Sequence, residues 1–137
     1  MYEKLIRGLK KNGLGRVKAP FAGHPQCAAV LVLLCQEGYD FEILLTKRSQ
    51  LVTHHRGEVA FPGGIWEQRD TDMLETAFRE TKEEIGLPRD YIEPITVLPP
   101  TTPCNGQTHV TPFVGRLIGN PKLTVQASET VSYTHLR

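Results

Sequence analysis

The segment 61–87, FPGGIWEQRDTDMLETAFRETKEEIGL, constrains the fold of this chain more than any other stretch. It predicts a helix with a continuous buried side, because at about 100° per residue several apolar or small side chains fall together. These side chains are Leu74, Ala77, Phe78, Thr81 and Ile85. Gly86 follows at a position where helices commonly end in a left-handed residue. A helix of this kind has to bury its apolar side, and a sheet is the expected partner.

A different side of the predicted helix carries Glu80, Glu83 and Glu84. Residues three and four apart are neighbours on a helix, so these like charges repel each other unless something offsets them. Mg²⁺ is bound through carboxylate oxygens and shares its remaining positions with water and substrate phosphates. Arg79 precedes Glu83 by four residues and is expected to pair with it. An ordinary charged helix face is the alternative. The metal site is favoured because Pro-Gly-Gly at 62–64 lets the backbone approach a ligand or a metal.

The sequence RETKEEIGL, residues 79–87, resembles the signature REUXEEXGU (U apolar) of the Nudix hydrolases, which cleave nucleoside diphosphates linked to another group. The family pattern has a glutamate ahead of the arginine, whereas this chain has Asp70, one position earlier. This one-residue expansion of the family pattern resembles the spacing in the coenzyme A pyrophosphatase branch of the family. The resemblance also implies that a carbonyl of Gly63 or Gly64 joins the metal shell.

A diphosphate repels an attacking water or hydroxide, and divalent cations overcome this by neutralising phosphate oxygens and acidifying water. We therefore assign Glu80 and Glu84 as the principal ligands of Mg²⁺ or Mn²⁺, with Arg79 as a structural partner. Glu83 is a further ligand or the group that orients or deprotonates the water. The general base stays open between Glu83, Glu129 and a segment beyond this chain.

The segment 44–64, LLTKRSQLVTHHRGEVAFPGG, resembles the signature LLTxRSxxLRxHxGxVxFPGG found beside the motif in coenzyme A pyrophosphatases. Two positions depart from it, because Val52 stands where leucine is usual and Thr53 where arginine is usual. Arginine offers a planar fork that suits phosphate, and one histidine matches the pattern. The expected substrate contacts, besides Gly63 and Gly64, are therefore Arg48, His55 and Arg56.

The remaining segments predict an α/β fold. An amphipathic helix is expected at 1–11, and strands are expected at 27–35, 41–48, 58–61, 92–98 and 108–118, the last broken by Pro112. The resemblance narrows this to a Nudix-type α/β/α sandwich with a mixed sheet. We expect an N-terminal helix and linker at 1–26 and a Nudix domain at 27–130 that is incomplete at its C-terminus. Residues 131–137, VSYTHLR, resemble a translated sequencing adaptor and are expected to be a tail foreign to the domain.

Composition argues against several other classes of protein. The net charge of +1 gives no general attraction to nucleic acid or membranes. Three cysteines without a CxxC spacing argue against a disulfide framework and a zinc site. No apolar run suits a membrane span or a signal peptide, so a cytoplasmic location is expected. The expected partner is a small nucleotide substrate, and homodimerisation is left open.

The leading functional hypothesis is divalent-metal-dependent hydrolysis of the diphosphate bond of coenzyme A and its derivatives. The products would be 3′,5′-ADP and 4′-phosphopantetheine. Thr53 keeps a second hypothesis open, in which the substrate is another nucleoside diphosphate derivative such as ADP-ribose or a dinucleotide. A third hypothesis is a non-catalytic Nudix-fold fragment, which a shortened chain would favour and the complete glutamate set disfavours.

Overall fold

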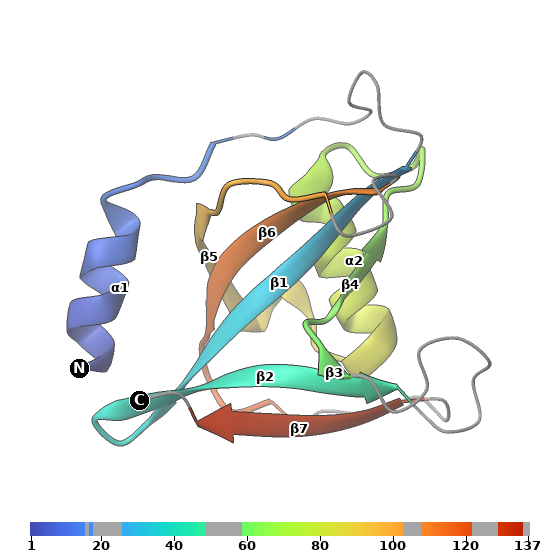
Figure 1. The fold of residues 1–137 in the computed structure, drawn as a ribbon. Helices are drawn as coiled ribbons and strands as arrows, with labels where there is room; N and C mark the ends of the chain where they lie inside the picture. Colours follow the sequence, from blue (N-terminus) through green and yellow to red (C-terminus); the bar gives the residue numbers. More distant parts are fainter. Residues whose placement is uncertain (16, 18–25, 49–58, 103–107, 122–128, 136–137) are drawn as a thin grey trace.

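The computed structural model describes residues 1–15, 17, 26–48, 59–102, 108–121 and 129–135 (Figure 1). The described elements in chain order are α1 (Tyr2–Lys10), β1 (Gln26–Glu37), β2 (Asp40–Arg48), β3 (Val59–Ala60), β4 (Gly63–Ile65), α2 (Met73–Ile85), β5 (Ile92–Val97), β6 (Thr108–Leu117) and β7 (Glu129–His135). A short 3₁₀ helix, Arg89–Tyr91, connects α2 to β5.

Strand β1 is the centre of the sheet. The described strands form one seven-stranded mixed sheet in the order β3-β2-β1-β6-β5, with β4 paired to β1 and β7 paired to β2. β1 runs parallel to β6 and antiparallel to both β2 and β4. The predicted hairpin of the first two strands is confirmed, because Glu37 lies opposite Asp40 across its turn.

One face of the sheet packs against α2. Every second side chain of β1 belongs to this core, namely Cys27, Ala29, Leu31, Leu33 and Cys35. The helix contributes Met73, Ala77, Phe78 and Ile85 to the same cluster. Thr81 is also buried, and its hydroxyl donates a hydrogen bond to the Ala77 carbonyl at 2.7 Å. The predicted buried side of the helix is therefore confirmed, although Leu74 is only partly buried.

The opposite face of the sheet is covered in part by α1. Tyr2 and Ile6 are buried in a second cluster with Leu34, Ile95 and Val114. The two helices thus flank the mixed sheet, as Figure 1 shows, and the predicted α/β/α sandwich is confirmed. Neither of the two α-helices in the described part of the chain is long and apolar enough to cross a membrane.

The prediction that Pro112 breaks the fifth long strand is wrong. β6 runs continuously through this residue, which lies opposite Val30 of β1. The Pro112 carbonyl accepts a hydrogen bond from the Leu98 amide at 2.8 Å, just beyond the end of β5. Because the N–H and C=O of one strand residue point to the same side, the missing donor falls on this side. The ladder with β1 therefore stays intact.

The two glycines that follow the predicted strand 58–61 form part of the sheet in the structure. Gly63 and Gly64 lie in the short strand β4, where they pair with Val30 and Ala29 of β1. The strand before them, β3, is shorter than the predicted 58–61. β1 is long enough to pair with β4 near its start and with β2 near its end, which is why the glycines extend the sheet.

Part of the predicted site lies outside the described residues. His55 and Arg56 fall in 49–58, which the structure does not describe. Of the predicted tail, residues 131–135 continue in β7, which pairs antiparallel with β2.

Candidate active site

Helix α2 is fixed at both ends by its own sequence. The Asp72 carboxylate accepts a hydrogen bond from the Glu75 amide at 3.0 Å, which caps the start of the helix. Gly86 ends it in the left-handed conformation with φ of 70°, as predicted. With the helix held in this way, its acidic side faces the start of the sheet segment β4.

The two glycines of β4 bring that segment against both β1 and α2. A Cβ placed on Gly63 would collide with the backbone of Ala29 and Val30. A Cβ placed on Gly64 would lie 2.5 Å from Cδ of Glu80. The Gly63 amide also donates a long hydrogen bond to Glu84 Oε2 at 3.4 Å. The acidic side of α2 therefore rests directly on the glycine pair, which only residues without side chains permit.

Arg79 connects several carboxylates on the acidic side of α2. Its Nε and Nη2 donate to the two Asp70 oxygens at 2.9 and 3.0 Å, and Nη2 also donates to the Ile65 carbonyl at 2.9 Å. Its Nη1 donates to Glu80 Oε1 at 2.7 Å and lies 3.4 Å from Glu83 Oε2. The predicted pairing of Arg79 with Glu83 is confirmed, but Asp70 is the closer-bound partner. These bonds, those with Asp70 above all, raise the pKa of Arg79 above its ordinary value.

Asp70 holds the Arg79 guanidinium from inside the protein. It is 7% exposed and also accepts hydrogen bonds from the Thr76 hydroxyl at 2.9 Å and the Glu67 amide at 3.0 Å. Burial acts to raise the pKa of Asp70, but the hydrogen bonds from Arg79, Glu67 and Thr76 outweigh it and lower the pKa. The sequence placed Asp70 in the family pattern without giving it this role.

Glu80 is a partly buried carboxylate on the acidic side of α2. Its side chain is 18% exposed, and burial raises its pKa above the ordinary value. Arg79 opposes this shift, while the like charges of Glu83 and Glu67 add to it. A group in this environment is stabilised when positive charge is brought beside it.

The structure brings together six of the predicted site residues: Arg79, Glu80, Glu83, Glu84, Gly63 and Gly64. In the described part of the chain, no three acidic, histidine or cysteine side chains converge as a preformed metal site, and Glu80 and Glu83 instead turn toward Arg79. Arg48 and Glu129 face each other in the pairing of β2 with β7, where only the backbone is described.

The residues present fit a divalent cation by their chemistry. Glutamate oxygens and a backbone exposed by glycine are hard oxygen donors of the kind that Mg²⁺ and Mn²⁺ accept. Glu80 is partly buried, and its carboxylate lies where a Cβ of Gly64 would stand. A glutamate on an ordinary solvent-exposed helix face has neither feature.

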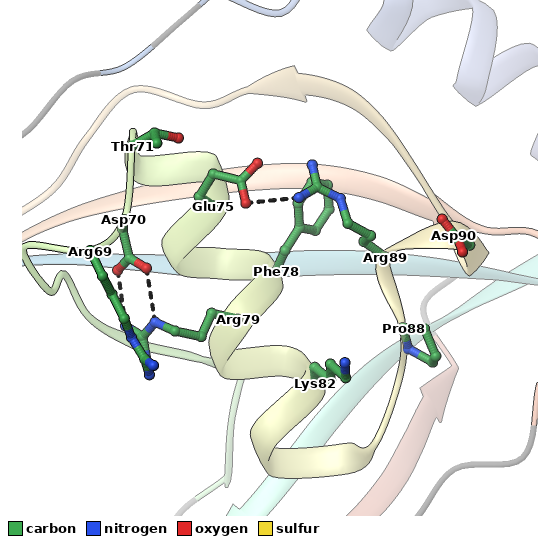
Figure 2. A pocket seen from close by; sticks show the side chains of 10 residues that line it. All are labelled: Arg69, Asp70, Thr71, Glu75, Phe78, Arg79, Lys82, Pro88, Arg89 and Asp90. Atoms are coloured by element: carbon green, nitrogen blue, oxygen red, sulfur yellow. Dashed lines mark hydrogen bonds and ion pairs between the residues drawn. The ribbon is translucent and has the colours of Figure 1, made fainter.

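A cavity of about 690 Å³ lies along the outer side of α2. Figure 2 shows that its lining runs from Arg69 and Arg79 at one end to Arg89 at the other, past Phe78. Arg89 is paired with Glu75 at 2.8 Å and stacks on the Phe78 ring, 4.7 Å from its centroid. Arg69 lines this cavity and also pairs with Glu83 on the acidic side of the helix, with 3.3 Å between Nη2 and Oε1.

Solved structures share this fold. One of them is a Nudix hydrolase from M. smegmatis called RenU, with a TM-score of 0.68, 21% identity and coverage of 90% of this chain and 80% of that one. The C. elegans Ap4A hydrolase, solved as a binary complex, has a TM-score of 0.66 at 19% identity, covering 80% of each chain. These identities support the shared fold alone.

Relatives and a family model agree with the fold. The Nudix hydrolase NudL of Klebsiella pneumoniae (strain 342) is 42% identical over 102 residues, which is 74% of this chain and 51% of NudL. The chain thus spans about half the length of the curated relatives it matches. The model described as the NUDIX domain matches residues 25–134. Together with the helix–glycine arrangement, this match over most of the chain establishes that the protein belongs to the NUDIX family.

Proposed function

We propose that this protein catalyses divalent-metal-dependent hydrolysis of the diphosphate bond of coenzyme A and its derivatives, giving 3′,5′-ADP and 4′-phosphopantetheine. The observation that carries the proposal is the contact of the acidic side of α2 with the glycine pair of β4. There the Glu80 carboxylate lies over Gly64, and Glu84 accepts from the Gly63 amide. Membership of the NUDIX family supports the same class of reaction.

The sequence supports coenzyme A as the substrate. Residues 44–64 resemble the coenzyme A pyrophosphatase signature at most positions, including Arg48 and His55. Arg48 and Arg56 supply guanidinium groups for phosphate oxygens, and the signature's arginine is replaced at Thr53. Thr53 is the observation that favours a second candidate, another nucleoside diphosphate derivative such as ADP-ribose or a dinucleotide.

In this proposal Glu80 and Glu84 bind the cation. Glu83 is a further ligand or the group that orients or deprotonates the attacking water. When bound, Mg²⁺ or Mn²⁺ supplies positive charge to the phosphate oxygens and makes water more acidic. Arg79 orients the Glu80 and Glu83 carboxylates through its Nη1 atom. The Gly63 amide orients Glu84. The chain thus contributes mainly positioning and charge, which dominate phosphoryl-transfer catalysis.

Glu83 is the first candidate for accepting a proton from the attacking water. Its side chain is 45% exposed, so water reaches it more freely than Glu80 at 18%. Water oxygen attacks one phosphorus, the bridging P–O bond breaks, and the water proton passes to the acceptor carboxylate. Glu129 is the other candidate acceptor within this chain.

The proposal is tested by incubating the chain with coenzyme A, ADP-ribose or a dinucleotide, with Mg²⁺, with Mn²⁺, or with a chelator. Chromatography and mass spectrometry identify the products. We expect 3′,5′-ADP from coenzyme A only when the metal is present. Turnover of ADP-ribose without turnover of coenzyme A would favour the second candidate. Tight nucleotide binding without any turnover would favour a non-catalytic module.

The metal-ligand assignment is tested by Glu83→Gln and Glu84→Gln, made separately. Each change removes a negative oxygen while keeping the shape of the side chain, so we expect metal-dependent turnover to fall at least about 100-fold with the fold intact. Circular dichroism reports the fold. Glu75→Gln is the matched control, because Glu75 lies on α2 but pairs with Arg89 in the outer cavity. Near-normal rates in either test variant would refute the assignment.

A further inference from the structure

Two arginines approach the same carboxylate, and they are held very differently. Arg79 Nη1 lies 3.4 Å from Glu83 Oε2, and Arg69 Nη2 lies 3.3 Å from Glu83 Oε1. The Arg79 side chain is 14% exposed and is fixed by Asp70 and the Ile65 carbonyl. The Arg69 side chain is 65% exposed and forms ion pairs with Glu83 and with Glu67, the latter at 2.7 Å.

A divalent cation on the acidic side of α2 would compete with both arginines for carboxylate oxygens, but only one of them is free to move away. In the proposed function it binds oxygens of Glu80 and Glu84 with Glu83 as a further ligand, and it repels a guanidinium beside these carboxylates. Arg79 is held in place, because its Nε and Nη2 bond to Asp70 and the Ile65 carbonyl while only Nη1 reaches Glu83. Arg69 can withdraw, because exposed ion pairs contribute little and its side chain reaches solvent.

Resting on the proposed function, we propose that Arg69 is a substrate-binding residue that holds Glu83 in the metal-free protein and turns to the diphosphate when the cation takes that carboxylate. A guanidinium released beside a cation-bound diphosphate meets oxygens that match its planar fork. The outer cavity, which Arg69 lines, gives the released side chain room to move (Figure 2). Arg69 then exchanges one anionic partner for another.

The test is Arg69→Ala in the full chain, with two measurements. Electron paramagnetic resonance of free Mn²⁺ gives the dissociation constant for Mn²⁺ without substrate. We expect this constant to fall about two- to fivefold, because the cation no longer displaces an ion pair. Steady-state kinetics on the diphosphate that the wild-type chain turns over give the second measurement. We expect KM to rise about tenfold, with kcat changed much less.

Two further variants sharpen the result. Arg69→Lys keeps the charge without the fork and should give an intermediate KM. Arg89→Ala removes the guanidinium at the far end of the cavity, which pairs with Glu75, and should change neither measurement.

Three outcomes would overturn the inference. If Arg69→Ala binds Mn²⁺ as the wild type does and keeps its KM, the inference fails and the proposed function stands. If Arg69→Ala binds Mn²⁺ more weakly, Arg69 supports the carboxylates instead of competing for them, and the inference again fails alone. If the wild-type chain binds no Mn²⁺, the proposed function fails and the inference fails with it.

Discussion

Asp70 is the residue on which the order of the acidic side depends most. It is buried, and four hydrogen bonds converge on its carboxylate, two from Arg79, one from the Thr76 hydroxyl and one from the Glu67 amide. Arg79 in turn positions Glu80 and Glu83. A change at Asp70 therefore reaches carboxylates that it does not touch.

Asp70→Asn should destabilise the protein at neutral pH. Neutralising Asp70 breaks a buried ion pair and removes the charge that Nε and Nη2 of Arg79 contact, which costs about 3 kcal/mol. The folded pKa of Asp70 is lowered, so its contribution is present above the unfolded value of about 4 and is lost as pH falls through the folded pKa. Urea unfolding at several pH values should therefore show a gap between wild type and variant that is full at pH 7 and shrinks in acid.

Asp72→Asn is the matched control for this change. It alters the same functional group two residues away, and asparagine caps a helix about as well as aspartate. We expect it to leave the free energy of unfolding nearly unchanged at pH 7. Equal losses in both variants would mean that the charge of Asp70 has no special role.

The residue scale also shows what spacing can and cannot predict. Arg79 and Glu83 are four apart on one helix, so their contact follows from helix periodicity alone. Asp70 lies in the loop before the helix, where no periodicity relates it to Arg79. The ion pairs of Arg69 were missed for the same reason, since Arg69 reaches the helix from that loop.

At the scale of elements, the site is the contact between β4 and α2. The two glycines of β4 face different neighbours: Gly63 meets the backbone of β1, and Gly64 meets the Glu80 side chain. Backbone cannot give way without disturbing the sheet, whereas a glutamate can rotate. Stability and activity should therefore separate between these adjacent positions.

Gly63→Ala should destabilise the fold by more than about 1 kcal/mol, because the added carbon collides with the backbone of Ala29 and Val30. Gly64→Ala should cost less stability but lower turnover by about 100-fold, because it displaces the Glu80 carboxylate. Thermal unfolding and steady-state rates on the same preparations measure both effects. Gly38→Ala is an unsuitable control because of its positive φ, whereas Gly8→Ala, with open space around it, is a suitable one.

Element types were predictable from the sequence where burial sets a clear period. The apolar side of α2 follows from this rule, whereas β1 is predictable as a continuous apolar run and is buried on both faces of the sheet. The Pro112 prediction fails because the effect of a proline depends on which side of its strand the nitrogen faces, and here that side meets Leu98, just beyond the end of β5. The strand β4 was missed because a glycine pair carries no side-chain pattern, and its pairing is decided by the length of β1.

At the scale of the whole molecule, one strand connects nearly everything described above. β1 pairs with β2, β4 and β6, and its side chains enter both the cluster under α2 and the cluster under α1. The acidic side of α2 is positioned against it through β4. The position of the site is therefore fixed by this strand as well as by the helix.

The central place of β1 has a consequence for how the protein opens in solution. Amides exchange with solvent deuterium only when their hydrogen bonds break, and those shared by most elements are released last. The Leu31 amide, bonded to the Pro62 carbonyl at 2.8 Å, should therefore keep its proton until the whole domain unfolds, while those of α1 exchange sooner. Mass spectrometry of deuterium uptake would show this order, and loss of the β1 protons together with those of α1 would contradict it.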